Sequence, residues 1–134
     1  MVQIVGKYQY VSAENFEEYL NTLGNTEIAQ SFLHSTPIIE VQQNGEQWVI
    51  TVNNKGKTGC AKFKLGEVYE EQLLSLPNSF KSVTTREGNC FRTETSFSAD
   101  VKSVRIYEFT ADGMTVHLSS DKSDVKAKRM YKRL

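Results

Sequence analysis

The sequence predicts an all-β domain, an antiparallel meander of about ten strands that closes as a sandwich or barrel, with two helices inserted after the first strand. Three observations lead to this prediction. Turn-forming residues cut the chain roughly every 8 to 12 residues, apolar side chains alternate with period 2 after residue 37, and one early stretch has helical spacing instead. The 134 residues are enough for a single domain, 1–134, with its own core.

The helical stretch lies between Ser12 and Ser35, and we expect a two-helix lid over about residues 14–35. Its first helix is expected to end at Gly24, a typical helix stop, and its second to begin near Thr26. The apolar faces of the two helices are predicted to consist of Phe16, Tyr19, Leu20 and Leu23, followed by Ile28, Ala29, Phe32 and Leu33.

The rest of the chain reads as short strands between turns. In the segment after the first hairpin, Trp48, Ile50 and Val52 share one face, as expected for a strand with one buried side. A barrel of about ten strands is wider than the eight that side chains just fill, so we expect an interior of ligand size, covered by the helices. The turns that define the strands are Asn44-Gly45, Asn53–Gly56, Pro77-Asn78, Glu87–Asn89, Asp112-Gly113 and Ser119–Asp124.

The composition argues against several classes of function. Sixteen Lys and Arg residues balance sixteen Asp and Glu residues, so the chain has no overall field that would attract nucleic acid or an anionic membrane. The N-terminal residues lack the apolar run of a signal peptide, and we therefore expect a cytoplasmic protein. In that reducing compartment Cys60 and Cys90 are expected to be free thiols, buried as small apolar side chains.

The C-terminal residues 126–134 concentrate charge, since five of these nine are Lys or Arg. Read as a strand, this segment places Arg129 and Tyr131 on one face, together with Ala127. If that face is interior, the guanidinium needs a partner, and a ligand carboxylate supplies one. Spacing alone leaves open that the pair lies on an exposed face. The other face would carry a solvated row of Lys126, Lys128, Met130 and Lys132.

Several motifs along the chain are similar to those of one family. They are Gly6-Lys7-Tyr8, Asn15–Leu20, Phe63–Gly66 and Lys81-Ser82. In this order they resemble the cytosolic fatty-acid-binding proteins, the intracellular lipid-binding group that includes retinoid and bile-acid carriers. The resemblance implies a ten-stranded up-and-down barrel with a two-helix lid between its first and second strands. It also implies a lipid held inside by an Arg-x-Tyr pair, here Arg129-Met130-Tyr131, with Phe16 at a ligand-facing position.

Many of these carriers have a second inward arginine, and here the sequence is ambiguous. Counted from the Asp112-Gly113 turn, that position falls on Glu108, whereas counted from Lys81-Ser82 it falls on Ile106, beside Arg105. A shift of one residue reverses the faces of a strand, so the register decides which of the two side chains faces the interior. An inward Glu108 would favour a bulkier or less acidic ligand.

The function expected from these observations is that of a monomeric intracellular carrier for a long-chain fatty acid or a similar hydrophobic carboxylate. The ligand-binding residues would be Arg129, Tyr131, Arg105 and Phe16. We expect no catalysis, cofactor, metal, nucleic acid or stable membrane association, since no catalytic or phosphate-binding motif occurs and His34 and His117 lie far apart. The alternatives are a carrier of the same fold for a bile acid, retinoid or other bulky amphipath, and an interaction or nucleic-acid module that uses the basic C-terminus.

Overall fold

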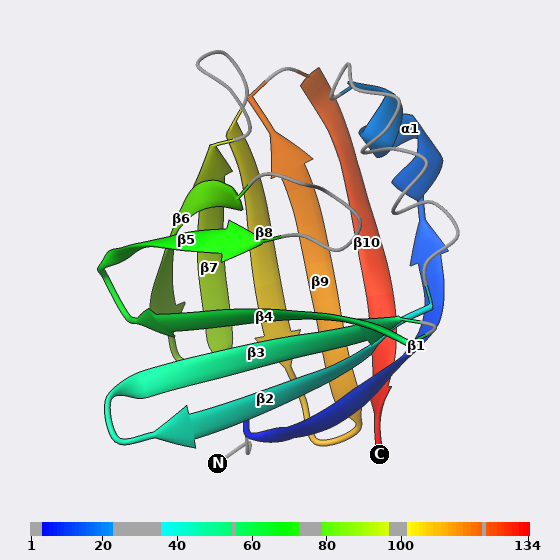
Figure 1. Cartoon of the computed structure of the whole chain (residues 1–134). Coiled ribbons are helices and arrows are strands. Elements are labelled where there is room, and N and C mark those ends of the chain that lie inside the picture. The colour runs from blue at the N-terminus through cyan, green and yellow to red at the C-terminus, as the bar shows by residue number, and fades with distance from the viewer. Residues whose placement is uncertain (1–3, 23–35, 55, 73–78, 97–101, 122) are drawn as a thin grey trace.

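The fold is a nearly closed barrel of ten antiparallel strands with a helix beside its last strand (Figure 1). The computed structural model describes residues 4–22, 36–54, 56–72, 79–96, 102–121 and 123–134. The elements are β1 (Gly6–Glu14), α1 (Phe16–Thr22), β2 (Ile38–Asn44), β3 (Gln47–Asn54), β4 (Lys57–Lys64), β5 (Val68–Gln72), β6 (Ser79–Glu87), β7 (Cys90–Ser96), β8 (Lys102–Phe109), β9 (Gly113–Ser120) and β10 (Ser123–Arg133).

The strands follow one another as a meander that the first and last strands close. The sheet order is β4-β3-β2-β1-β10-β9-β8-β7-β6-β5, so every neighbouring pair except β1 and β10 is also consecutive in the chain. The edge strands β4 and β5 are themselves consecutive, which places the interruption of the barrel between two chain neighbours. The predicted ten-stranded barrel is thus confirmed.

β1 bends where it passes from β2 to β10. Its first residues, Gly6–Gln9, pair with β2, and its pairing with β10 shifts register between Tyr10 and Ser12. A bulge of this kind bends a strand and leaves one residue outside the ladder, and Val11 is accordingly 56% exposed. Beyond the bend, Ser12, Ala13 and Glu14 continue the pairing with β10 up to the start of α1.

α1 begins directly after β1. Asn15 lies between them with a φ of 55°, a left-handed conformation that asparagine tolerates, and its carbonyl oxygen accepts a hydrogen bond from the Tyr19 amide at 3.0 Å. Because β1 continues to Glu14, the helix starts later than Ser12, the beginning of the stretch with helical spacing. The predicted second helix lies outside the described residues.

Inward side chains alternate with outward ones along the strands, and large aromatic groups fill the end of the barrel near the two termini. Phe91 is fully buried, and its ring contacts Trp48, Phe63 and Phe109 with centroids 4.9, 6.2 and 5.4 Å apart. Tyr8 extends this cluster, 5.7 Å from Phe109. Aromatic rings therefore fill this end of the barrel, and the polar inward side chains lie towards the other end.

Both cysteines are free thiols, as predicted, but one prediction about their burial is wrong. Cys60 is exposed on β4, because it alternates with Ala61, whose side chain is buried on the inner face. Cys90, at the start of β7, is partly buried.

Candidate functional site

Arg129 is a buried cation on the inner face of β10. Its side chain is 7% exposed, and its neighbours in the ladder are Val116 of β9 and Ala13 of β1. Its guanidinium carbon lies 4.5 Å from the ring centroid of Tyr10 and 4.6 Å from that of Phe16. Aromatic faces stabilise a cation that has lost water, and they leave its N–H fork able to bind an anion.

Tyr131 places a hydroxyl group next to this cation. It follows Arg129 on the same face, is 7% exposed, and its ring centroid lies 5.8 Å from the guanidinium carbon. Burial raises the pKa of Tyr131 to about 12, although the charge of Arg129 opposes the shift. The group therefore remains a neutral O–H donor at physiological pH.

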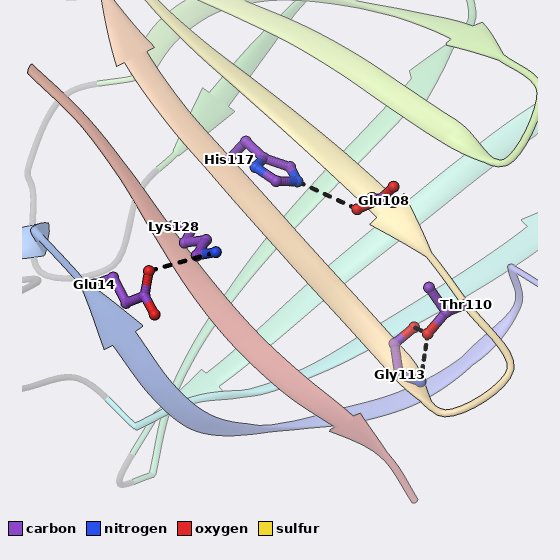
Figure 2. Close-up of polar contacts among 6 residues, drawn as sticks. All are labelled: Glu14, Glu108, Thr110, Gly113, His117 and Lys128. Carbon is purple, nitrogen blue, oxygen red and sulfur yellow. Dashed lines mark hydrogen bonds and ion pairs between the residues drawn. The ribbon is translucent and has the colours of Figure 1, made fainter.

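The outer face of β10 carries the basic row predicted for it. Lys126 and Lys132 are exposed, and Lys128 forms an ion pair with Glu14 of β1 at 3.4 Å (Figure 2). The alternation predicted for this strand is confirmed, with Arg129 and Tyr131 inside and the lysines outside.

The register of β8 settles the ambiguity between Arg105 and Glu108. Glu108 points outward and pairs with His117 of β9, with its Oε1 3.3 Å from Nε2 (Figure 2). Arg105 shares the inner face with Tyr107, since it donates from Nη1 to the Tyr107 hydroxyl at 3.1 Å and from Nη2 to Thr95 Oγ1 at 2.8 Å. An inward Glu108 that competes for Arg129 is thus excluded by the geometry.

The two inward arginines lie on either side of β9, and their ladder partners on that strand are two residues apart. Arg129 and Tyr107 both pair with Val116, whereas Arg105 pairs with Leu118. β9 runs away from the end of the barrel near the two termini and towards α1 (Figure 1), and Leu118 follows Val116 along it. The site is thus a diagonal of two Arg-x-Tyr pairs rather than two arginines side by side.

α1 covers this polar region with two buried aromatic residues. Phe16 packs on Arg129, and the Tyr19 hydroxyl donates to the Ser119 carbonyl oxygen at 3.0 Å. Burial raises the pKa of Tyr19 to about 12, and the nearby Arg105 charge lowers it in part. The helix therefore contacts both arginine regions.

All four residues predicted for the site lie on the inner side, and others were missed. A second Arg-x-Tyr motif, Arg105-Ile106-Tyr107, repeats the pattern of Arg129-Met130-Tyr131. This repeat could have predicted from the sequence that Tyr107 lies at the site. Tyr10 had no such signal, because it reaches Arg129 only through the pairing of β1 with β10. Of the two histidines, His117 lies on the outer surface and His34 outside the described residues.

Within the described ranges, no helix has both the length and the apolar character required to cross a bilayer. The same part of the chain contains no group of three or more His, Cys, Asp or Glu side chains arranged to hold a metal ion.

Comparison with known proteins gives a consistent result. No protein-family model matches the chain. A fatty acid-binding protein of Tyrophagus putrescentiae is 31% identical over 134 residues, and the match covers 99% of each chain. Among solved structures, a fatty acid-binding protein from brain tissue of Drosophila melanogaster is 30% identical, with a TM-score of 0.81 over 97% of this chain and 99% of that one.

A third protein supports the fold alone. The fatty acid-binding protein of Schistosoma mansoni, solved in complex with arachidonic acid, superimposes with a TM-score of 0.86 at 24% identity, covering 97% of this chain and 95% of that one. Three observations point to the same family: the 31% identity over the full length, the ten-stranded barrel and the inward Arg-x-Tyr pairs. The chain belongs to the fatty acid-binding protein family.

Proposed function

We propose that the protein is a carrier that binds a long-chain fatty acid inside its barrel and keeps it in solution. The observation that carries this proposal is the buried Arg129 beside the neutral hydroxyl of Tyr131. A guanidinium in a water-poor place holds a carboxylate through two parallel hydrogen bonds, and the phenol adds a third donor. Names of relatives, and the arachidonic acid complex of one structural neighbour, support the same ligand class.

The two parts of such a ligand would be bound by different forces. Burial of the hydrocarbon chain contributes about 0.8 kcal/mol per methylene group and does not depend on direction. The carboxylate sets the orientation, with Arg129 and Tyr131 as its first partners, Arg105 as a second cation and Phe16 as a cover. Because Glu108 faces outward, the interior keeps the positive charge that favours a fatty carboxylate over a less acidic amphipath.

Arg129→Gln tests the anchoring role. Loss of charge-assisted hydrogen bonds is expected to weaken fatty-acid affinity roughly tenfold to hundredfold in calorimetric titration. Lys126→Gln is the matched control, since it removes one positive charge from the outer face of the same strand, and its affinity should equal that of the wild type. Equal affinities for all three proteins would contradict the assignment of Arg129.

Native mass spectrometry of the purified protein tests the ligand class. Co-purified fatty acids are the expected result. A protein that took up only bile salts or retinoids would favour the carrier of bulkier amphipaths, and a protein that took up no amphipath would overturn the carrier function.

The carrier would act as a cytoplasmic monomer that binds rather than transforms its ligand, without nucleic acid or stable membrane association. Zero net charge and the ordinary outward row of lysines support this. Size-exclusion chromatography should show a mass near 15.2 kDa. Nucleic-acid binding that weakened steeply with salt would instead support the interaction module.

A further inference from the structure

Buried hydroxyl groups line three adjacent strands of the barrel. Each of these residues is no more than 2% exposed, and we call the set the hydroxyl band: Ser82, Thr84, Thr93, Thr95 and Ser103. On β7 the buried Thr93 and Thr95 alternate with the exposed Arg92 and Ser96. The band therefore faces the interior, on β6, β7 and β8.

Four of the five hydroxyl groups form two hydrogen-bonded pairs, and one pair also contacts Arg105. Thr84 and Thr93 lie 2.7 Å apart between their Oγ1 atoms, and the Tyr69 hydroxyl lies 2.8 Å from Thr84. Ser82 Oγ lies 2.8 Å from Thr95 Oγ1, the same atom that accepts a hydrogen bond from Arg105. One set of polar contacts thus joins β5, β6 and β7, and a second joins β6, β7 and β8.

The inner faces of β9, β2 and β3 carry apolar side chains. On β9 the inward residues are Met114, Val116 and Leu118, and on the opposite side β2 and β3 contribute residues such as Val41 and Ile50. A buried hydroxyl costs free energy unless it is hydrogen-bonded, so an alkyl chain alone would be lined equally well by valine in place of threonine. Among the described buried residues, serine and threonine occur only on β6, β7 and β8, and this restriction points to a polar part of the ligand.

The band has hydrogen-bonding capacity left for a ligand. A threonine hydroxyl offers one proton and two lone pairs. Among the described residues, Thr93 uses one of these in its bond to Thr84, and Thr95 uses two, with Ser82 and Arg105. An oxygen atom of a ligand at this wall would find both donors and acceptors.

The band begins beside Arg105, but Thr93 on β7 is separated from the Arg129–Tyr131 pair on β10. Three strand spacings of about 4.8 Å lie between these two strands, about 14 Å along the wall. We propose, on the basis of the proposed function, that the hydroxyl band is a second polar subsite that selects fatty acids with a hydroxyl or keto oxygen on the hydrocarbon chain, remote from the carboxylate. The anchor holds one end of the ligand, and Thr93 contacts the oxygen further along.

The experiment compares stearic acid with its mid-chain hydroxy derivative by calorimetric titration of the delipidated protein. The wild type is expected to prefer the hydroxy acid, because that ligand alone satisfies the band. Thr93→Val should reduce the preference roughly threefold to tenfold, the range for one lost hydrogen bond. Thr84 keeps its contact with Tyr69 in this variant, so the Thr84 hydroxyl retains a hydrogen-bond partner.

Two further variants control for side effects. Thr85→Val makes the same chemical change on the exposed face of β6 and should retain the preference. Ser82→Ala is a second test at the other hydroxyl pair, where Thr95 still accepts from Arg105, and should also reduce it. Reduced preference in Thr93→Val or Ser82→Ala, but not in Thr85→Val, supports the subsite.

Other outcomes overturn it in distinguishable ways. Equal affinity of the wild type for the two acids, or an equal effect of Thr85→Val, would reject the second subsite and leave the carrier function standing. Failure of the wild type to bind either acid would reject the carrier function and the subsite together.

Discussion

Arg129 and Tyr131 show how a buried polar residue is stabilised by its surroundings. The guanidinium lies against the rings of Tyr10 and Phe16, which are apolar enough to pack and still attract a cation. The tyrosine next to it is neutral, because burial makes ionisation costly. The pair therefore presents N–H and O–H donors to the interior, the donors that a carboxylate accepts.

The raised pKa of Tyr131 predicts how stability depends on pH. Above a pH of about 10 the unfolded chain ionises this tyrosine while the folded protein does not until about 12. The stabilising contribution is therefore complete below pH 10 and is lost between pH 10 and 12, on the order of 2–3 kcal/mol. Tyr131→Phe should flatten the decline of the urea midpoint over this range. An unchanged slope would show that Tyr131 titrates normally.

Side chains alternate between the two faces of a strand, so each strand has two chemically different faces. β10 is basic outside and carries the candidate anchor inside, while β8 carries Arg105 inside and Glu108 outside.

The β8–β9 turn is closed by Thr110, whose Oγ1 accepts from the Gly113 amide at 3.1 Å (Figure 2). Gly113 itself begins β9, and it is buried against β10.

Gly113→Ala should therefore destabilise the protein by about 3 kcal/mol or more. An added Cβ would collide with the Tyr131 backbone carbonyl oxygen and lie 3.0 Å from Lys132 Cα, and neither atom can move without separating β9 from β10. Gly45→Ala is the control, because it has open space but a φ of 63°, and it should cost about 1 kcal/mol. Equal urea midpoints for the two variants would show that the close strand contact is not what requires glycine.

The whole molecule is polarised between two ends. Aromatic rings pack the end near the termini, whereas arginine, tyrosine and hydroxyl groups line the interior towards α1. Closure depends on β1 pairing with β10, a contact between the two ends of the sequence. Loop-closure entropy makes such contacts slow to form, so we expect folding on the millisecond-to-second scale typical of β-barrels.

Arg133 joins three parts of the chain at the aromatic end. Its guanidinium donates to the carbonyl oxygens of Thr110 at 3.1 Å and Val5 at 3.4 Å, and lies 4.9 Å from the Tyr8 ring centroid. Arg133→Gln is expected to lower the free energy of unfolding by about 1–3 kcal/mol, measured by urea titration. The exposed neighbour Lys132, changed to Gln, should have an effect within about 0.5 kcal/mol. Comparable losses in both variants would refute the role of Arg133.

The sequence by itself determined a meander of about ten strands and the residues that share a face of its last strand. Period-2 alternation and turn chemistry are local properties, so they predicted the strands and, for β10, one face with Arg129 and Tyr131. Resemblance to a family added the barrel and the inward direction of that face. The late start of α1 and the exposure of Cys60 escaped this reading, because strand length and the choice of face depend on pairing partners.

Tertiary structure decided what depends on register between strands. Arg105 rather than Glu108 faces inward because β8 is aligned against β7 and β9, and a shift of one residue would have reversed them. Tyr10 meets Arg129, and the hydroxyl groups of β6, β7 and β8 meet one another, only across the barrel wall. Tyr10 and Arg129 are distant in the chain, and the hydroxyl pairs of β6 and β7 depend on the register of their hairpin, so alternation along one strand predicts neither contact.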